Sequence, residues 1–448
     1  MAGNHKKDHV FTVNVFEIKK EKMKHVIIGN GIAGISVAET IRKSRSGDEI
    51  IMIGNESVPS YWRANLTKYI LGSTPEEKMR VKPEGWLEKN EIHPITGEVR
   101  QINSEAGNII YQTGDREDTL EFDRLCVATG ASPIMLKIPG HNLPEVLTYR
   151  SLQDANYLKS RLRDIKRMVV IGGGVLGLEV VEITVKSGIH CTIFQLGSKI
   201  GLPLVDDQAA EILLRRVTGR DGTHEQGAEV MFDVQAKEFL ELNGHVQGIR
   251  LKDDSFVPCD MVVICIGIAA NPQLFENSGL SFECGLVVDA HQQTSVPGIY
   301  GAGDCVIYPN ESGQMVPTRT WVTSRIQGKT AGFNMCDIPC LLFDEGPMYN
   351  ASYLFDMFYT VMGEFNAVGE EYQSYSSQPD ECSYRKIIFK NDRVVGAMML
   401  GNRNGDQAIR RLIAQNVEIV AEADKKSLLD PAFDPNDLAT QGVEYIMY

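Results

Sequence analysis

Two glycine-rich segments of the chain could each bind the pyrophosphate of a dinucleotide. Residues 29–34 read Gly-Asn-Gly-Ile-Ala-Gly and residues 172–177 read Gly-Gly-Gly-Val-Leu-Gly, so both have the spacing Gly-x-Gly-x-x-Gly. In this spacing the first glycine permits a tight turn, the second lets the backbone approach the phosphates, and the third lets a helix pack against its strand. The N–H groups at the start of that helix then face the anion. The sequence therefore predicts two separate dinucleotide sites.

Each glycine-rich segment lies between a predicted strand and a predicted helix, which is the context that the motif requires. A buried strand at residues 24–28 precedes the first segment, and a helix at residues 35–44 follows it. A strand at residues 167–171 and a helix at residues 178–187 flank the second segment in the same way. A lone motif is weak evidence, but the order of strand, loop and helix strengthens it.

The residue that receives the ribose hydroxyls usually lies at the end of the next strand, about 20 residues after the glycines. In the first fold the strand at residues 49–54 leads to Glu56, although Asn55 could hold this position instead. In the second fold the strand ends in the neutral Gln195, where an NAD site usually has an acid and an NADP site often has Arg. Lys199 could reach a 2′-phosphate, but a lysine in a surface loop is more often simply solvated.

A third segment, residues 294–304, combines a strand with a turn of small residues that ends in a carboxylate. Gly301 and Gly303 leave room for a close approach of another group. Asp304 precedes a predicted helix start, where its carboxylate can accept hydrogen bonds from a hydroxyl and from backbone N–H groups.

These motifs together resemble the pyridine nucleotide-disulfide oxidoreductase family of flavoproteins with two dinucleotide-binding domains. The resemblance includes residues 127–130, which close the first fold, and residues 263–267, which close the second, and it covers residues 24 to about 400. It implies that the first fold holds FAD, that the second holds NAD(P)H, and that Asp304 receives a hydroxyl of the flavin ribityl chain. NADH is weakly favoured.

Residues 61–68, Tyr-Trp-Arg-Ala-Asn-Leu-Thr-Lys, are similar to the stretch Tyr-x-Arg-Pro-x-Leu-Ser-Lys of rubredoxin and [2Fe–2S] ferredoxin reductases and of the flavin module of NADH-dependent nitrite reductase. The resemblance implies that Lys68 lies beside the flavin N5 and pairs with Glu179. Physical chemistry supports this pair, because a carboxylate that is buried in the first turn of a helix needs a cation or strong hydrogen-bond donors to stay charged. An exposed lysine and a carboxylate favoured by the helix dipole would also fit.

Residues 319–328 are similar to the family segment that opens a helix beside the flavin ring, with Trp321 nearest the flavin. A tryptophan that only fills the core is nearly as good an interpretation. The predicted catalytic residues are Lys68 and Glu179. The predicted cofactor-binding residues are Gly29, Gly31, Ala33, Gly34, Glu56, Arg63, Lys68, Ala128, Thr129, Gly130, Gly172, Gly174, Gly177, Gln195, Gly267, Gly303, Asp304 and Trp321.

The cysteines argue against thiol chemistry. None of the nine forms a CxxC or CxxxxC motif in the first domain. Thiol-using members of the family carry a cysteine in the stretch around residue 65, where this chain has Asn65. We therefore expect hydride to pass from NAD(P)H to FAD and electrons to pass on to a small rubredoxin-like or ferredoxin-like protein, or to a partner redox subunit. The alternatives are a redox-sensing NAD(P)H-binding flavoprotein with slow turnover, and an NADH oxidase, peroxidase or disulfide reductase.

The composition excludes other classes of function. A net charge of −14 argues against nucleic acid as a partner, and no apolar run is long enough to span a membrane. The first 24 residues lack the features of a secretory signal, and the scattered cysteines suit a reducing compartment, so we expect a cytoplasmic protein. We identify no metal site. A homodimer is possible.

The expected fold class is α/β, with two Rossmann-like FAD- and NAD(P)-binding domains and an α+β C-terminal interface domain. In the C-terminal region, strands at residues 355–363, 384–390 and 393–401 precede a helix at residues 406–416. The expected domains are an FAD-binding domain at residues 24–147 and 272–345, an NAD(P)-binding domain at residues 148–271, an interface or dimerisation domain at residues 346–448, and an N-terminal extension at residues 1–23.

Overall fold

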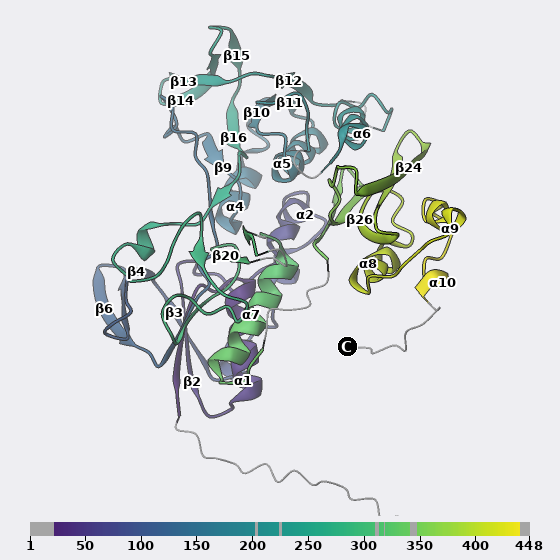
Figure 1. The fold of residues 1–448 in the computed structure, drawn as a ribbon. Helices are drawn as coiled ribbons and strands as arrows, with labels where there is room; N and C mark the ends of the chain where they lie inside the picture. Colours follow the sequence, from purple (N-terminus) through teal and green to yellow (C-terminus); the bar gives the residue numbers. More distant parts are fainter. Residues whose placement is uncertain are drawn as a thin grey trace, which may run out of the picture.

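The computed structural model describes residues 22–201, 205–223, 226–309, 313–317, 319–340 and 347–439. Nearly all of the expected N-terminal extension and the end of the C-terminal tail lie outside these ranges. The described chain forms two parallel sheets and one large antiparallel sheet, each with its own helices (Figure 1). This arrangement confirms the α/β class with two nucleotide-binding folds and an α+β C-terminal unit.

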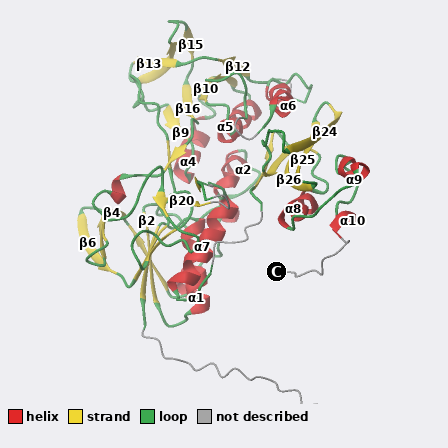
Figure 2. Cartoon of the chain, in the orientation of Figure 1, coloured by secondary structure: helices red, strands yellow, loops and turns green. Residues whose placement is uncertain are grey.

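The first sheet is parallel and has five strands. In spatial order they are β19 (Ile299–Gly301), β7 (Arg124–Val127), β1 (Lys24–Ile28), β2 (Glu49–Gly54) and β3 (Ile92–Thr96). The central strands are continuous apolar runs, as expected for strands covered on both faces. Helices α1 (Ile32–Ser44) and α7 (Trp321–Met335) lie together on one side of this sheet (Figure 2).

Close packing of α1 on α7 depends on glycines. A Cβ atom added to Gly328 would lie 2.4 Å from the carbonyl oxygen of Ala33, and one added to Gly332 would lie 2.8 Å from Cβ of Thr40. The two helices can therefore approach only because these positions carry no side chain. Strand β19 and helix α7 follow the second fold in the sequence but belong to the first fold, so the first fold is built from two separate parts of the chain.

The second sheet repeats the design of the first. Its strands, in spatial order, are β12 (Glu229–Phe232), β11 (His190–Gln195), β10 (Arg167–Ile171), β16 (Met261–Ile264) and β9 (Val146–Thr148), and its helices are α4 (Leu152–Arg161), α5 (Val175–Lys186) and α6 (Asp207–Val217). Strand β9 straddles the expected domain boundary at residue 147 and pairs with β16 in the second sheet. The remaining boundaries stay predictions.

Short helices, short strands and single turns complete these two folds. They are α2 (Leu66–Ile70), α3 (Trp86–Lys89), β4 (Glu98–Asn103), β5 (Asn108–Thr113), β6 (Arg116–Glu121), β8 (Ser132–Pro133), β13 (Ala236–Leu242), β14 (His245–Leu251), β15 (Phe256–Pro258), β17 (Ile268–Ala269), β18 (Leu286–Val287), β20 (Val306–Pro309) and β21 (Met315–Val316), with 3-10 turns η1 (Arg63–Asn65), η2 (Glu76–Met79) and η3 (Gln273–Phe275). The strands pair in antiparallel fashion except for β18, which is parallel to β20. Strands β8 and β17 pair with each other where the chain crosses between the two folds.

The C-terminal unit is an antiparallel sheet with helices packed beside it. Its strands, in spatial order, are β22 (Tyr349–Leu354), β23 (Met357–Gly363), β26 (Arg393–Gly401), β25 (Ser383–Lys390) and β24 (Tyr372–Asp380), followed in sequence by α8 (Asp406–Ala414), α9 (Glu422–Ser427) and α10 (Asn436–Ala439). The sequence predicts the three inner strands, which are largely buried, and α8, which buries one face through Ala408, Ile409 and Leu412. It does not predict the polar edge strands β22 and β24.

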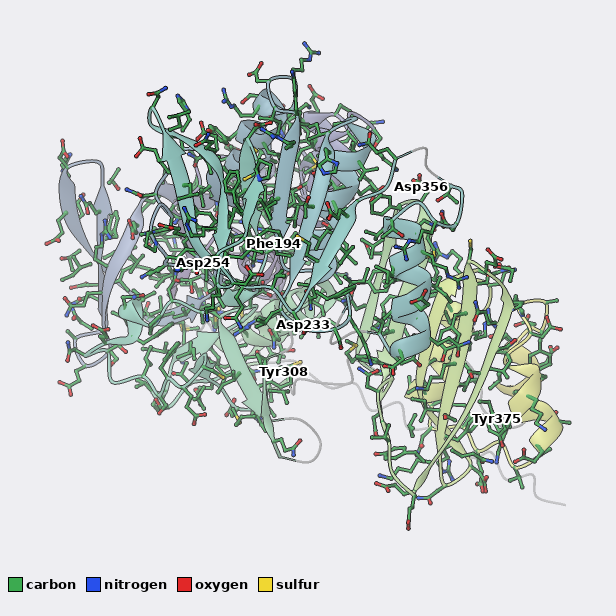
Figure 3. All side chains as sticks on the ribbon, turned by 90° about the horizontal axis from the view of Figure 1, so that it is seen from above. Phe194, Asp233, Asp254, Tyr308, Asp356 and Tyr375 are labelled. Atoms are coloured by element: carbon green, nitrogen blue, oxygen red, sulfur yellow. The ribbon has the colours of Figure 1, made fainter. Side chains whose placement is uncertain are left out.

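Side chains of α5 and α6 attach the second fold to the C-terminal sheet. Asp206 caps α6 and also accepts hydrogen bonds from Tyr384 (2.9 Å) and Lys386 (3.1 Å) of β25. Lys186 bridges to Asp356 over 2.9 Å, and Figure 3 shows Asp356 on the side of the C-terminal sheet that faces the second fold. Within the described residues, no helix has the length and apolar character needed to cross a membrane.

Candidate functional site

The first glycine-rich loop forms an open cradle at the start of α1. Gly29 has φ +112°, and Gly34 packs so closely that an added Cβ would lie 2.0 Å from the Gly29 carbonyl oxygen. At Gly31, by contrast, no described heavy atom lies within 4 Å of the Cβ position. Gly31 caps α1 without any side-chain hydrogen bond, so the N–H groups of the first turn face open space. This cradle fits a phosphate group.

The second glycine-rich loop has the same geometry at the start of α5. Gly172 has φ +106°, and a Cβ on Gly177 would lie 1.9 Å from the Gly172 carbonyl oxygen. Around the Cβ position of Gly174, the described part of the chain again leaves 4 Å of free space, and this N-cap also lacks a side-chain hydrogen bond. The two loops therefore have the same open geometry, and each fits a phosphate group.

Other predicted contact residues differ in their surroundings. Gly130 (φ +70°) and Gly267 (φ +118°) are in conformations that favour glycine, and Gly130 has open space at its Cβ position as far as the described residues show. Ala128 and Thr129 lie beside Gly29, since an added Cβ there would meet the Ala128 carbonyl oxygen at 2.1 Å and the Thr129 nitrogen at 3.2 Å. These residues shape the cradle of the first fold.

Ala33, which the sequence suggests as a cofactor contact, packs against protein. It is only 5% exposed. A Cβ on Gly303 would lie 3.0 Å from its methyl group, and Gly328 covers its carbonyl oxygen. The side chain of Ala33 is therefore part of the helix packing, and a contact of this residue with a cofactor stays a prediction.

The strand-end position of the first fold is Gly54, not Glu56. Ile28 pairs with Ile53 in the first sheet as Ile171 pairs with Phe194 in the second, so the next residues along the chain, Gly54 and Gln195, are equivalent. In the first fold the side chain of Asn30 fills this space, because a Cβ on Gly54 would lie 2.5 Å from its amide carbon.

Glu56 lies two residues further along and is held by other side chains. It forms an ion pair with Arg63 and accepts a hydrogen bond from the Tyr61 hydroxyl at 2.7 Å. The Arg63 guanidinium lies 4.8 Å from the centre of the Tyr61 ring and donates to the Arg150 carbonyl at 3.1 Å. The structure thus brings Glu56 and Arg63 together in one cluster beside the first cradle.

Arg150 connects this cluster to Asp304, and sequence reasoning missed it. Its guanidinium bridges to Asp304 over 2.6 Å, while Ser324 donates to the other oxygen of Asp304 at 3.2 Å. Gln327 accepts from the Gly303 N–H at 2.8 Å and fixes the turn. Asp304 is therefore held by Ser324 of α7 and by Arg150, two residues before α4. No local pattern at residue 150 points to this long-range contact.

Glu179 lies at the junction of all three units. The Thr67 hydroxyl, from α2 of the first fold, donates to its carboxylate at 3.3 Å. Burial raises the pKa of Glu179 to about 7; the Thr67 hydrogen bond opposes this rise, the nearby charge of Glu182 adds to it, and the charge of Lys68 opposes it. Tyr359 of β23 has a pKa raised by burial and then by the Glu179 charge.

Lys68 and Glu179 do not form the expected ion pair in this structure. Lys68 is exposed, and no direct contact joins it to Glu179 among the described side chains. Thr67, the preceding residue, is the hydrogen-bonding partner. Because successive residues on a helix point in different directions, only one of the two can face α5 at a time.

Trp321 stacks on Trp62, with ring centroids 4.4 Å apart and an angle of 19° between the rings. The indole N–H of Trp321 is buried and has no acceptor in the part of the chain that the structure describes. A buried donor without an acceptor is costly, so this group suits a bound molecule that presents an oxygen or nitrogen acceptor. The flavin ring carries such acceptors.

The buried cysteines are poor nucleophiles. Burial raises the pKa values of Cys191, Cys259 and Cys265 to about 12, and it also raises those of Cys126 and Cys305. These thiols stay protonated at neutral pH. Among the described residues, no group of three or more His, Cys, Asp or Glu side chains is placed to hold a metal ion.

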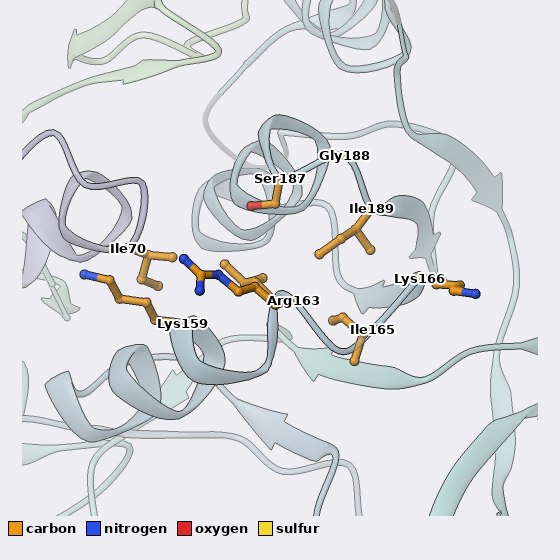
Figure 4. A pocket seen from close by; sticks show the side chains of 9 residues that line it. Ile70, Lys159, Arg163, Ile165, Lys166, Ser187, Gly188 and Ile189 are labelled. Carbon is orange, nitrogen blue, oxygen red and sulfur yellow. The ribbon is translucent and has the colours of Figure 1, made fainter.

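A surface pocket of about 540 Å³ lies between the ends of α2, α4 and α5 (Figure 4). It is lined by Ile70, Lys159, Leu162, Arg163, Ile165, Lys166, Ser187, Gly188 and Ile189. Lys159 is already engaged, because it donates to the Tyr69 carbonyl at 3.1 Å and lies over the Tyr69 ring. None of the predicted site residues lines this pocket, so we place the chemistry at the glycine cradles.

Comparison with known proteins gives a consistent picture. Residues 23–328 match the pyridine nucleotide-disulphide oxidoreductase family. The nitrite reductase [NAD(P)H] of Bacillus subtilis is 26% identical over 92% of this chain and 49% of its own length. The ferredoxin–NAD(+) reductase subunit of a Pseudomonas putida benzene 1,2-dioxygenase system is 30% identical over 67% of this chain and 71% of its own length.

The same architecture occurs in a crystal structure of a ferredoxin reductase from Rhodopseudomonas palustris, with a TM-score of 0.83. That protein is 24% identical in sequence, and the match covers 94% of this chain and 100% of that one. The chain spans about half the length of two of its curated relatives from Bacillus subtilis.

Proposed function

Because the chain belongs to the pyridine nucleotide-disulphide oxidoreductase family, we propose that it transfers hydride from NAD(P)H, held by the second glycine cradle, to FAD, held by the first. FAD and NAD(P)H are the cofactors of this family. The observation that carries the proposal is the pair of open cradles at Gly31 and Gly174, together with the Thr67–Glu179 contact that joins their two folds.

The residues of the first fold would hold FAD in distinct ways. The α1 N-terminus would bind the pyrophosphate, and the cluster of Glu56 and Arg63 would receive the adenosine half. Asp304, fixed by Arg150 and Ser324, would accept a hydrogen bond from the ribityl chain. FAD, when bound, supplies the chemistry: it accepts hydride from the nucleotide and releases electrons to another acceptor.

The protein's own groups would orient the reactants and control charge between them. The α5 N-terminus would hold the pyrophosphate of the nucleotide. Glu179, with a pKa near 7, would carry or release a proton at the junction, and Thr67 would fix the position of its carboxylate. Lys68, although exposed here, would add positive charge beside the same junction.

We further propose a small iron–sulfur or rubredoxin-like protein, or a partner redox subunit, as the electron acceptor. The support is the similarity to a ferredoxin–NAD(+) reductase subunit and to a nitrite reductase. The raised thiol pKa values favour direct exit of electrons from the flavin over exchange with a disulfide. A homodimer and a cytoplasmic location are also compatible with the sequence.

An anaerobic titration tests the proposal. The purified FAD protein is mixed with NADH or NADPH while flavin absorbance is followed, and oxidised rubredoxin or ferredoxin is then added. Rapid bleaching followed by reoxidation supports the reductase. Failure of both nucleotides to bleach the flavin contradicts hydride transfer, and bleaching that only oxygen reverses contradicts the protein acceptor. Turnover far below about 1 per second with every acceptor would instead indicate a redox sensor.

A further inference from the structure

The side chain of Gln195 is fixed in one orientation at the end of β11. The N–H of Gly173, in the second glycine-rich loop, donates to Oε1 of Gln195 at 2.8 Å. A reversed amide would place its NH₂ group against another N–H donor, so only one orientation is compatible with this contact. The loop therefore holds the carboxamide oxygen and directs the NH₂ group away from itself.

The NH₂ group of Gln195 remains available to a ligand. This NH₂ group donates to no acceptor within the described chain. It is also not buried, because Gln195 has no buried side-chain atom without a hydrogen-bond partner, so the NH₂ group is open to solvent. The equivalent amide in the first fold differs, because Nδ2 of Asn30 donates to the carbonyl of Glu56 at 3.1 Å. Only the second fold thus presents a free amide donor where ribose recognition normally takes place.

The described charged side chains that follow Gln195, as far as residue 207, form ion pairs. Lys199, the candidate for a 2′-phosphate, forms an ion pair with Asp207. Asp206 is paired with Lys386. Residues 202–204 are Leu-Pro-Leu and carry no charge. Asp233 directly follows the neighbouring strand β12, and its side chain is exposed, so the surrounding water weakens the field of its carboxylate. Residues 195–201 and 205–207 therefore contain no unpaired acid and no unpaired cation that could select between NADH and NADPH.

We infer that the second site accepts NADH and NADPH with comparable efficiency because Gln195 donates a hydrogen bond to either ribose 2′ substituent. The inference rests on the proposed function for the assignment of this site to a nicotinamide nucleotide. A carboxylate at this position accepts from the 2′-hydroxyl and repels a 2′-phosphate, whereas a guanidinium attracts the phosphate. An amide N–H can donate to a hydroxyl oxygen and to a phosphate oxygen alike.

The test separates recognition of the adenosine half from hydride transfer. Affinities of the FAD protein for 5′-AMP and for adenosine 2′,5′-bisphosphate are measured by calorimetry, and kcat/KM values are measured for NADH and NADPH. The wild-type protein should show ratios within about tenfold for both pairs, since the same neutral donor bonds to the hydroxyl or to the phosphate, and the stronger bond to the phosphate is worth about one power of ten. A ratio above about a hundredfold in either direction overturns the inference.

Two substitutions of Gln195 and two matched controls sharpen the test. Gln195→Glu keeps an acceptor for the Gly173 N–H and should shift both ratios at least about tenfold toward the compounds without the phosphate, while Gln195→Arg should shift them the other way. Lys199→Ala and Asp233→Asn should each change the ratios by less than about threefold. A large effect of either control, or none of Gln195→Glu, assigns selection elsewhere and overturns the inference.

The outcomes also distinguish this inference from the proposed function. If both fragments bind equally and depend on Gln195, but neither nucleotide bleaches the flavin, the inference stands and hydride transfer fails. If a nucleotide bleaches the flavin rapidly while the fragments differ more than about a hundredfold in affinity, hydride transfer stands and the inference fails. If neither fragment nor nucleotide binds, both fail.

Discussion

The hydroxyl of Thr67 donates to the carboxylate of Glu179 over 3.3 Å, and it does so from one nucleotide-binding fold to the other. The contact places a titratable group of α5 against α2 without a direct cation partner. Because burial sets the pKa of this carboxyl to about 7, its charge changes within the physiological range. The first two predictions follow from this pair.

Glu179 should make the folded protein less stable as pH rises toward neutrality. Its pKa is about 7 when folded and ordinarily 4.5, so the folded state binds more protons than the unfolded chain between these values. Stability is therefore lost as pH rises through this window and is level above it, at a cost of at most about 3 kcal/mol.

Glu179→Gln should remove this cost. The melting temperature of the variant minus that of the wild type should be near zero at pH 5 and rise to about 2–5 °C at pH 8. The measurement is a thermal melt of the FAD-bound proteins across this pH range. A difference that does not change with pH would contradict the assignment of the shifted pKa to Glu179.

Removing the Thr67 hydroxyl should raise the pKa of Glu179 further, because this hydrogen bond favours the charged carboxylate. Thr67→Val should shift the pH midpoint of anaerobic flavin reduction by NADH upward by roughly half to one unit. Thr67→Ser keeps the hydroxyl and serves as the control. Equal profiles for the valine and serine variants would show that the hydroxyl has no electrostatic role.

Substitutions of two glycines should separate cofactor binding from folding. Gly31→Ala places a methyl group in the open cradle and should reduce FAD content while the apoprotein keeps its melting temperature. Gly328→Ala drives a methyl group against the Ala33 carbonyl and should destabilise the protein by about 1–3 kcal/mol. Flavin content and thermal melts of both apoproteins check this. Equal destabilisation would contradict an open cradle at Gly31.

The stack of Trp62 on Trp321 should stabilise the region by about 0.5–1.5 kcal/mol beyond the burial of apolar surface. Trp62→Leu should lower the melting temperature and alter the tryptophan fluorescence of the apoprotein, whereas Trp62→Phe should retain much of the stack. The comparison is repeated in a Trp321→Phe background to isolate the pair. Additive effects in the two backgrounds would mean that the rings do not interact energetically.

Much of the fold follows from local sequence patterns. The glycine cradles depend on residues within six positions of each other, flanked by apolar strands, so residues 29–34 and 172–177 predict both their conformation and their role. The inner strands of the C-terminal sheet are also predicted locally, because β23 and β26 are mostly apolar and β25 contains the apolar run at residues 387–389. Edge strands β22 and β24 carry polar residues and gain their hydrogen bonds only from neighbouring strands, so no local pattern marks them.

The parts of the site that sequence reasoning missed are contacts between distant segments. Arg150 reaches Asp304 across 154 positions, and Thr67 reaches Glu179 across 112. Trp62 occupies a variable position in the motif that identifies residues 61–68, so nothing pairs it with Trp321 before the fold is known. The strand-end residue could have been found, because aligning the two glycine segments by their strands places Gly54 opposite Gln195.

The two strand ends also restrict how this chain can have evolved. In the first fold an asparagine in the loop fills the space beside a glycine, and in the second a glutamine on the strand fills the space beside Gly173. Converting either arrangement into the other takes two substitutions. One order creates a clash, as a Cβ on Gly54 does against Asn30, and the other leaves a hole. Each intermediate should therefore be less stable than the two complete arrangements, so the two residues at each strand end are constrained as a pair.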